Sequence, residues 1–418
     1  MAENLRPRQS AVRILIRVLA DGQTVDKAIE TEKDYETYSE SDRHFIRLLI
    51  LTTLRRMGQI DGVLNKLLKH PLPAKQRTVL MILRLAIAQS LFLKTPDYAV
   101  VHTAVSLTRH FHFDGLTGLV NGVLRHFFRL QNPLQGLENP QVNLPDWLYD
   151  SWVQTYGEIT ARGIAEAVLM PPPLDITVLK NKEQLAQKWN GQILPTGSIR
   201  VPVSTPTELA GFETEGCWVQ NAAAGVPAQL LTNPKGKKVA DLCAAPGGKT
   251  AQLAGMGAFV TAFDISVNRL KRLRENMERL GLSDRVRVIV ADALTISSEQ
   301  QFDAVLLDAP CSATGTLPRH PEIKYHRMPE DVKRLADLQC QLLNKALDLV
   351  PSGGEVVFST CSLQSEEGPD IITSVLDRAD IVTPSDRRWK PYLTKQGTLR
   401  FLPTEGFDGF FACLLRKK

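Results

Sequence analysis

The hydrophobic and polar positions of the chain follow a helical period in its first third. Between residues 1 and about 130 the apolar residues recur three and four positions apart, and no stretch alternates as a strand does. Three such runs are Val12, Leu15, Ile16 and Leu19, then Phe45, Leu48, Leu49 and Leu54, then Val79, Ile82, Leu83, Ala86 and Ile87. Gly58 and Pro96 interrupt the pattern where helices would turn. We therefore predict an all-helical domain over residues 1–140.

A different pattern begins near Lys237. Short apolar runs typical of strands, VADLCAA, FVTAFDI, VRVIVAD and FDAVLLDAP, alternate with a glycine turn and with the amphipathic segment SVNRLKRLRENMERLG. Such alternation builds a parallel sheet covered by helices, so we predict an α/β domain over residues 236–418. Before it, the stretch QNPLQGLENPQVNLPDW predicts a linker, and PPPLDITVL contains a strand. We assign residues 141–235 to this linker and a small α/β connecting subdomain.

Composition and charge narrow the class of protein. The chain has 418 residues, of which 43% are hydrophobic and 23% charged, the balance of a globular protein with more than one core. No apolar run approaches the roughly 20 residues of a membrane span, and the first segment has no secretory pattern, so we expect a cytoplasmic protein that does not enter a membrane. Residues 1–140 hold 19 Lys and Arg against 13 Asp and Glu, and the remainder holds 31 against 32. This surplus favours a polyanion-binding helical domain, although a solvated helix face has the same composition.

The cysteines and histidines do not form a metal-binding pattern. The six cysteines are widely spaced and show no CxxC pair, which argues against a disulfide framework and a structural zinc site. Histidines such as His44, His102 and His126 are scattered along helical segments and are interpreted as packing or surface residues. We expect no metal, and any special cysteine to be reactive rather than structural.

The turn in VADLCAAPGGKTAQLA is a candidate ligand site. Gly247 and Gly248 follow a buried strand and precede a helix, so the backbone can turn tightly and approach a ligand. A dinucleotide, a nucleoside triphosphate and S-adenosylmethionine all suit such a turn, and so does packing alone. Cys243 stands where a P-loop needs glycine, and GxGxxG is absent, which excludes the first two motifs.

Three predicted strands end in aspartate. Asp264 could accept the two ribose hydroxyl protons of an adenosine, Asp292 would lie near the adenine, and Asp308 closes a third strand. Helix capping is the alternative interpretation of each carboxylate taken singly. Their placement after consecutive strands favours a nucleoside-binding edge of the sheet.

Two cysteines follow adjacent strands of the predicted sheet, in DAPCSATGT and STCSLQSEEG. Cys311, Cys361 and Asp308 should therefore converge at one edge, although a lone cysteine is most often a small buried hydrophobe. Methylation at carbon 5 of cytosine requires such groups, because that carbon becomes nucleophilic only after a thiolate adds to carbon 6. An acid at nitrogen 3 and a base for the carbon 5 proton complete the chemistry.

The motifs DLCAAPGGKT, DAPCSATGT followed by RHPEIKYHR, STCSLQSEEG and FLPTEGFDGFFACLLRKK resemble the RNA cytosine-C5 methyltransferases of the NOL1/NOP2/Sun family. Within that family they look like the bacterial enzymes that act on small-subunit (16S) ribosomal RNA. The resemblance covers residues 239–418, and LVNGVLRHFFR resembles the end of the NusB-like RNA-binding domain of those enzymes. It implies a Rossmann-like catalytic domain that uses S-adenosylmethionine.

The resemblance also implies roles for individual residues. Cys361 would be the nucleophile, and Cys311 would assist release of the methylated base. Asp308 would reach the cytosine, with Lys249 directed towards the reacting centre. The cofactor pocket would be lined by Cys243, Ala244, Ala245, Pro246, Gly247, Gly248, Lys249, Asp264, Asp292 and Asp308. DNA cytosine methyltransferases use a Pro-Cys cysteine as nucleophile, so the chemistry of the sequence alone leaves Cys311 as the alternative.

The sequence leaves two competing functions open and predicts which surface binds RNA. The same chemistry on transfer RNA, and a non-catalytic RNA-binding protein, are the competing functions. We expect a monomer that binds small-subunit ribosomal RNA. Two basic faces are predicted to contact phosphates, one at the start of the first helix and one at the end of the helical domain. The residues of these faces are Arg6, Arg8, Arg13 and Arg17, and then Arg125 and Arg129.

Overall fold

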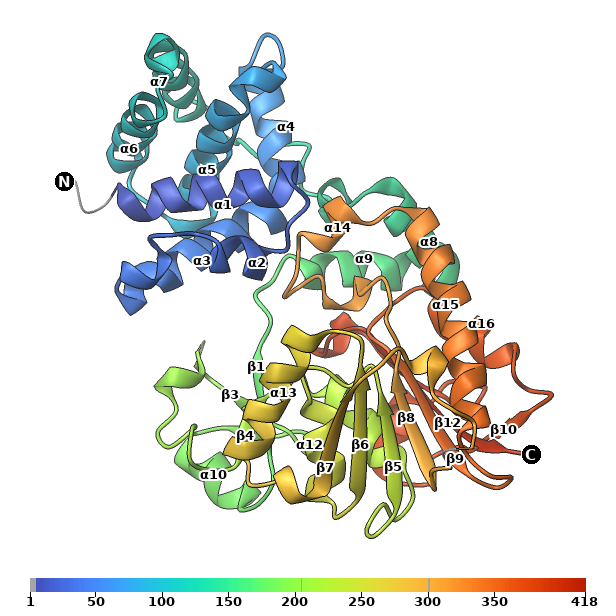
Figure 1. Cartoon of the computed structure of the whole chain (residues 1–418). Helices are drawn as coiled ribbons and strands as arrows, with labels where there is room; N and C mark the ends of the chain where they lie inside the picture. The colour runs from blue at the N-terminus through green and yellow to red at the C-terminus, as the bar shows by residue number, and fades with distance from the viewer. Residues whose placement is uncertain (1–4, 204, 300) are drawn as a thin grey trace. The chain divides into compact units, whose positions relative to one another are not determined.

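The computed structural model describes residues 5–203, 205–299 and 301–418. It divides into two compact units, each described by itself below (Figure 1). The first contains residues 1–170 and Leu317–His326, and the second contains Pro171–Thr316 and Arg327–Lys418.

The first unit is helical, as its period predicts. Its helices are α1 (Arg6–Ala20), α2 (Val25–Glu30), α3 (Glu40–Arg55), α4 (Met57–Leu67), α5 (Arg77–Leu93), α6 (Asp97–His110), α7 (Thr117–Phe127), α8 (Asp146–Tyr156), α9 (Glu158–Val168) and α14 (Ile323–His326). The apolar positions three and four residues apart point into one core cluster, to which α1, α3, α5 and α7 all contribute.

Helix α5 has the apolar character of a membrane span. Within the described residues, one helical stretch, Ala74–Leu93, is long and apolar enough to cross a membrane, and half of it is buried inside the protein. Ile82, Leu83 and Ala86 of this helix lie in the core of the helical unit. Packing in that core accounts for its composition.

The stretch predicted as a linker packs against α4 instead. The Gln59 backbone N–H donates to the Asn143 side chain at 3.1 Å, and the Gln59 amide donates to the Leu137 carbonyl at 3.0 Å. A Cβ on Gly58 would lie 1.7 Å from the Val142 carbonyl oxygen, so the backbones approach closely. The helical unit therefore extends past residue 140 and takes in α8 and α9, whereas the sequence places these residues in the connecting subdomain.

A segment from far along the chain, Leu317–His326, also belongs to the helical unit. Two nitrogens of Arg55 donate to the Pro318 carbonyl at 3.0 and 2.7 Å, and the Tyr325 hydroxyl donates to the Leu54 carbonyl at 2.8 Å. These contacts join residues more than 260 positions apart, which no local pattern predicts.

The predicted basic face at the start of α1 is not a free surface. Arg8 is 7% exposed and donates to the Gln89 side chain at 2.7 Å. Arg13 and Arg17 both form ion pairs with the buried Glu32, at 2.5 and 2.8 Å. The prediction is wrong for Arg8, which is buried. Arg13 and Arg17 share the single charge of Glu32, and their contact with phosphate stays a prediction.

The second predicted basic face is exposed, because Arg125 in the last turn of α7 and Arg129 just after it are both exposed. Their contact with phosphate stays a prediction.

The second unit begins with a small antiparallel sheet. Its strands are β1 (Leu174–Val178), β2 (Gln192–Ile193), β3 (Ile199–Val201) and β4 (Cys217–Val219), in the order β2-β3-β1-β4. Helix α10 (Lys182–Lys188) and a core that includes Trp189 cover it, and the short α11 (Val226–Leu230) leads into the larger sheet.

The larger sheet forms the rest of the second unit and carries the candidate site. Its strands are β5 (Lys238–Leu242), β6 (Phe259–Asp264), β7 (Val286–Val290), β8 (Ala304–Asp308), β9 (Glu355–Thr360), β10 (Ala379–Ile381), β11 (Leu399–Phe401) and β12 (Phe410–Lys417). The order is β10-β12-β9-β8-β5-β6-β7, with β11 pairing β12. Strands β5 to β9 pair in parallel, and β12 and β10 are antiparallel.

Helices join the parallel strands and pack on the sheet. They are α12 (Gly248–Gly255), α13 (Val267–Arg279), α15 (Pro329–Asp348) and α16 (Pro369–Thr373). Figure 1 shows the strands side by side, with α13 at one side and α15 and α16 at the other. The sheet order reverses between β5 and β8, and at such a switch point the strand ends of open α/β sheets bind ligands.

Candidate active site at the strand ends

Two cysteine side chains meet at the carboxyl edge of the large sheet. Cys311 follows β8 and Cys361 follows β9, and these parallel strands pair with Asp308 opposite Ser359. The two Sγ atoms lie 3.4 Å apart, and both residues are partly exposed. Because neighbouring parallel strands end at one edge, their loops bring together two thiols that are 50 positions apart in sequence.

Asp308 ends β8 beside the thiols and is held by two neighbours. The Lys249 ammonium donates to its Oδ2 at 2.6 Å, and the Ser359 hydroxyl donates to its Oδ1 at 2.8 Å. Lys249 also lies over the Phe410 ring, with Nζ 5.4 Å from the ring centre. The Asp308 side chain is 33% exposed, so a fixed carboxylate faces the space in front of the strand ends.

The surroundings of the Cys311 thiol disfavour its thiolate. The hydrogen bond with Cys361, together with burial, holds the pKa of the Cys311 thiol well above its usual value. The nearby charge of Glu367 acts in the same direction. Cys311 therefore stays protonated at neutral pH.

The glycine turn joins β5 to α12 next to this centre. Gly247 has φ of +105°, and a Cβ there would lie 2.7 Å from the Leu273 Cγ, so both conformation and space require glycine. Lys249 stands in the first turn of α12 and reaches Asp308. Burial raises the pKa of Cys243 to about 12, so this cysteine is not a nucleophile.

The other predicted lining residues surround the turn. Ala244 and Ala245 are buried, and Pro246 is exposed. The Ala244 N–H donates to the Phe263 carbonyl at 2.9 Å, which ties the turn to β6. The segment from Cys243 to Lys249 thus lies beside the ends of β6 and β8.

Asp264 and Asp292 take different positions at the strand ends. Asp264 is 4% exposed and accepts from the backbone N–H groups of Ser266 and Ala245, at 2.9 and 3.2 Å. Asp292 is exposed and accepts from the Leu294 N–H at 3.0 Å, which is the capping interaction. Both lie at the edge that carries the thiols, and their contact with a nucleoside stays a prediction.

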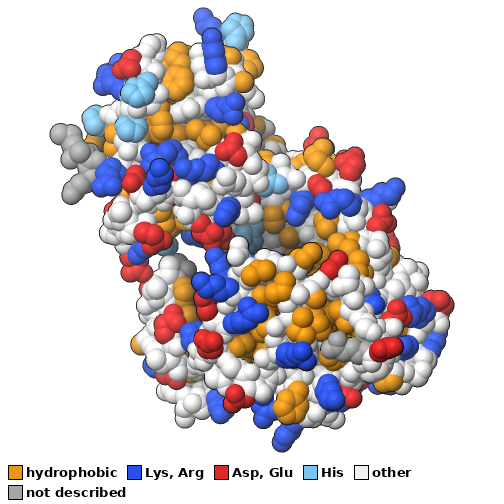
Figure 2. Space-filling view, viewed as in Figure 1, with side chains coloured by type: hydrophobic (Ala, Val, Ile, Leu, Met, Phe, Trp, Pro, Cys, Tyr) orange, Lys and Arg blue, Asp and Glu red, His pale blue; other side chains and the backbone are white. Residues whose placement is uncertain are grey.

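Exposed apolar side chains surround these two carboxylates. Ile265 is 72% exposed, Val267 is 61% exposed and Val290 is 46% exposed, and Val290 pairs directly with Asp264 across β6 and β7. Figure 2 shows hydrophobic side chains on this face of the second unit, in the region of α13 and the neighbouring strand ends. Apolar side chains beside a carboxylate at a strand end are the lining that the predicted nucleoside site requires.

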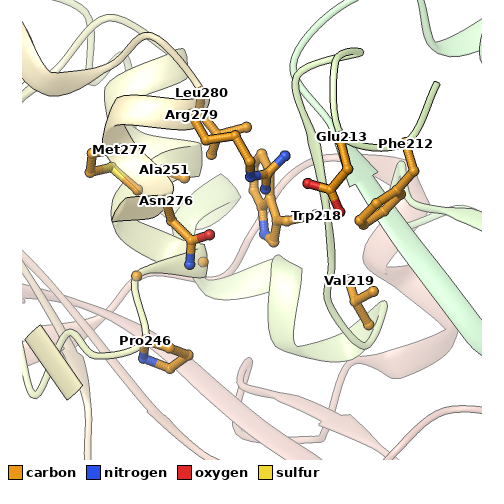
Figure 3. A pocket seen from close by; sticks show the side chains of 12 residues that line it. Phe212, Glu213, Trp218, Val219, Pro246, Ala251, Asn276, Met277, Arg279 and Leu280 are labelled. Atoms are coloured by element: carbon orange, nitrogen blue, oxygen red, sulfur yellow. The ribbon is translucent and has the colours of Figure 1, made fainter. Parts of the chain in front are cut away.

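A cavity of about 320 Å³ lies on the helix side of the glycine turn. Figure 3 shows Trp218 in its middle, with Asn276 and Arg279 of α13 on one side and Glu213 on the other. Pro246, Gly247 and Gly248 line it, but the thiols and the strand-end carboxylates do not. This cavity therefore shares the glycine turn with the predicted cofactor pocket but does not include the thiols.

Some residues of the site were not singled out from the sequence. Ser359 orients Asp308, and Glu367 lies behind the thiol loops. The chain also needs glycine at Gly315, where a Cβ would lie 2.0 Å from the carbonyl oxygen of Gly409. Gly315, Ser359 and Glu367 lie within the two cysteine motifs, so membership of those motifs was the signal that could have identified them from the sequence. Among the described residues, no group of three or more His, Cys, Asp or Glu could hold a metal ion.

Comparison with known proteins gives two matching family models. The model described as 16S rRNA methyltransferase RsmB/F matches residues 228–416, and the model described as NusB family matches residues 5–129. Two curated proteins named Ribosomal RNA small subunit methyltransferase B are each 32% identical to the chain. The one from Cronobacter sakazakii aligns over 100% of both chains, and the one from Escherichia coli over 98% of both.

Solved structures agree with the predicted fold. A methyltransferase homolog protein from Pyrococcus horikoshii is 31% identical, covers 68% of this chain and 97% of its own, and superposes with a TM-score of 0.57. The structure of PH0851, 24% identical, covers 98% of this chain and 99% of its own with a TM-score of 0.78. The prediction of a Rossmann-like methyltransferase domain preceded by a NusB-like helical domain is confirmed.

Proposed function

The chain belongs to the RsmB/F family of 16S rRNA methyltransferases, and from that premise we propose that it methylates carbon 5 of a cytosine in small-subunit ribosomal RNA. It is an enzyme of the methyltransferase class, and S-adenosylmethionine is its methyl donor. The observation that carries the proposal is the pair of thiols 3.4 Å apart beside the fixed carboxylate of Asp308. Methylation at nitrogen or oxygen would use no such pair.

We assign a separate role in this reaction to each of Cys361, Asp308 and Cys311. The thiolate of Cys361 adds to carbon 6 of the cytosine, and the ring electrons move towards nitrogen 3 and activate carbon 5. The proton shared by Lys249 and Asp308 passes through Asp308 to nitrogen 3 and neutralises this charge. After carbon 5 is methylated, its proton passes to water, the carbon–sulfur bond breaks, and the thiolate of Cys361 leaves while the thiol of Cys311 donates a hydrogen bond to the departing sulfur. Cys311 suits this role because its raised pKa keeps it a thiol, which can donate to the sulfur of Cys361.

The cofactor would be held at the ends of β5, β6 and β7. The turn from Cys243 to Lys249 would hold its methionine portion, Asp264 would hold its ribose, and Asp292 with the exposed Ile265 would hold its adenine. When bound there, S-adenosylmethionine supplies the methyl group. Lys249 holds Asp308 in place at the same edge and limits its movement.

The substrate is proposed to be RNA of the small ribosomal subunit, bound in part by the NusB-like helical unit. Both curated relatives carry that substrate in their names, and the surplus of basic residues in 1–140 fits a polyanion. We further propose that the protein acts in the cytoplasm as a monomer, without a metal.

The test uses methyl-labelled S-adenosylmethionine and two RNA pools, small-subunit ribosomal RNA and total transfer RNA, followed by bisulfite sequencing. We expect label in a single cytosine of the ribosomal RNA that resists bisulfite conversion. Label in transfer RNA alone would move the same chemistry to the competing substrate. Label in no RNA, or at an atom other than carbon 5, would contradict the proposed reaction.

A further inference from the structure

A buried polar bridge lies directly behind the two thiols and joins their loops. We call it the serine–glutamate bridge, and it consists of Ser312, Ser362 and Glu367. Ser312 donates to the Glu367 carboxylate through its backbone N–H, at 2.8 Å, and through its hydroxyl. The hydroxyls of Ser312 and Ser362 lie 3.2 Å apart. Each serine directly follows one of the reactive cysteines, so the bridge connects Cys311 to Cys361 from behind.

Further hydrogen bonds tie the two loops to one another. The Gly315 N–H donates to the Cys361 carbonyl at 3.0 Å, and the Leu363 N–H donates to the Thr314 hydroxyl at 3.0 Å. Within the loop of Cys361, the Thr360 hydroxyl donates to the Glu367 carbonyl at 2.8 Å. The separation of the thiols is therefore set by the bridge and by these backbone contacts.

Glu367 is an unusual residue for this position, because its side chain is fully buried. Within the described part of the chain, its carboxylate accepts only from Ser312 and from the Gln339 amide, at 3.1 Å for the latter, and forms no ion pair. Burying a carboxylate without a cation is costly unless hydrogen bonds replace its water. An uncharged side chain at position 367 would pack in this buried space at a lower desolvation cost than Glu367.

The negative charge of Glu367 is connected to Cys311 through fewer hydrogen bonds than to Cys361. Glu367 binds the N–H of the residue after Cys311, whereas it reaches the loop of Cys361 only through the hydroxyl of Ser362. A negative charge behind a thiol disfavours its thiolate. The charge of Glu367 accordingly raises the pKa of Cys311, together with the larger effects of its hydrogen bond to Cys361 and of burial.

From this geometry we propose that Glu367 is a positioning residue that fixes the spacing of the two thiols and makes them unequal, so that Cys361 attacks while Cys311 remains a thiol. Its place in catalysis rests on the proposed function, but the inequality of the thiols does not. The first measurement therefore needs neither RNA nor cofactor.

The experiment compares alkylation of the full chain by iodoacetamide at neutral pH in four proteins. They are the wild type, Glu367→Gln, Ser312→Ala and Glu366→Gln. The glutamine keeps the shape of Glu367 and removes its charge, and Glu366 is an exposed neighbour that serves as the matched control. Peptide mass spectrometry gives the labelling rate at each cysteine. Cys413, 1% exposed, labels only if the domain unfolds and reports on misfolding.

In the wild type and in Glu366→Gln, we expect Cys361 to label about tenfold or more faster than Cys311, since thiolate is the reactive form. In Glu367→Gln the ratio should fall by about threefold, because the hydrogen bond to Cys361 and burial still act on Cys311, with Cys413 still protected. Ser312→Ala should lower the ratio less, and it decides the question if Glu367→Gln does not fold. An unchanged ratio in a folded variant would overturn the proposal, and so would a wild type in which Cys311 labels faster.

A second measurement addresses catalysis with the same variants. Glu367→Gln should lower kcat for methyl transfer by about tenfold to a hundredfold, the loss expected for one charge-assisted hydrogen bond, with KM for RNA unchanged. A rise in KM alone, with kcat unchanged, would contradict a positioning role. If the wild type methylates no RNA, the proposed function fails while the labelling ratio still tests Glu367.

Discussion

Asp241 lies in β5, directly below the glycine turn, and offers a quantitative test of how this edge of the sheet is built. Its side chain is fully buried, and its Oδ2 accepts a hydrogen bond of 2.5 Å from the Thr250 hydroxyl. Burial raises the pKa of Asp241 from 3.8 to about 7. We predict that Asp241→Asn stabilises the second unit above neutral pH, because the amide keeps an acceptor for Thr250 without a buried charge.

The sign and size follow from the difference between folded and unfolded pKa. Between pH 3.8 and about 7 the folded protein keeps a proton on Asp241 that the unfolded chain has lost, so stability falls as pH rises through this window. At about 1.4 kcal/mol per pH unit, the loss is on the order of 4 kcal/mol once the pH exceeds 7. Asp241→Asn should remove this dependence, so its advantage is largest at pH 8 and nearly absent near pH 4.

Hydrogen exchange suits the measurement, because a protein with two units need not unfold in one step. Peptides covering β5 and β6 would be followed between pH 5 and pH 8, after correction for intrinsic exchange, in the wild type and in Asp241→Asn. The exposed carboxyl of Asp377 provides a control in Asp377→Asn, which should behave as the wild type. Parallel pH profiles for the wild type and Asp241→Asn would refute this account of the buried carboxyl.

Two further predictions follow from the surface and from the loops. Gly315→Ala places a Cβ 2.0 Å from the carbonyl oxygen of Gly409. The two loops must then separate by roughly 1 Å, which should lower kcat for methyl transfer by about a hundredfold. The control Gly118→Ala, with open space around its Cβ, should retain full kcat, and equal kcat values for the two variants would contradict the close approach of Gly315 to Gly409. Reversing Arg125 and Arg129 to Glu should weaken RNA binding and reduce the salt slope by about one per lost phosphate contact; filter binding from low to high salt measures both, and an unchanged slope would exclude this face.

The arrangement of the site could be predicted where a simple rule of topology applied. Parallel strands end at one edge, so Asp308, Cys311 and Cys361 had to lie near one another once their strands were recognised. The sequence could not establish whether Asp264 binds a ribose, because a carboxylate at a strand end can also accept from backbone N–H groups. Asp264 accepts from the N–H of Ser266.

Features that depend on distant or buried partners could not be predicted. Glu32 pairs with both Arg13 and Arg17 only because α2 folds back onto α1, which their spacing along one helix does not reveal. The segment Leu317–His326 has no apolar period of its own and joins the helical unit through tertiary contacts. Glu367 stood inside a motif quoted for its cysteine, and only its burial distinguishes it from the exposed Glu366.

The most direct test of the central claim is to incubate the protein with small-subunit ribosomal RNA and methyl-labelled S-adenosylmethionine, and to resolve protein–RNA adducts on denaturing gels. The wild type would be compared with Cys361→Ala and Cys311→Ala. We predict that Cys361→Ala neither methylates nor forms an adduct, while Cys311→Ala accumulates a methylated adduct that it cannot release. An adduct in Cys361→Ala and none in Cys311→Ala would contradict the assignment and exchange the roles of the two cysteines.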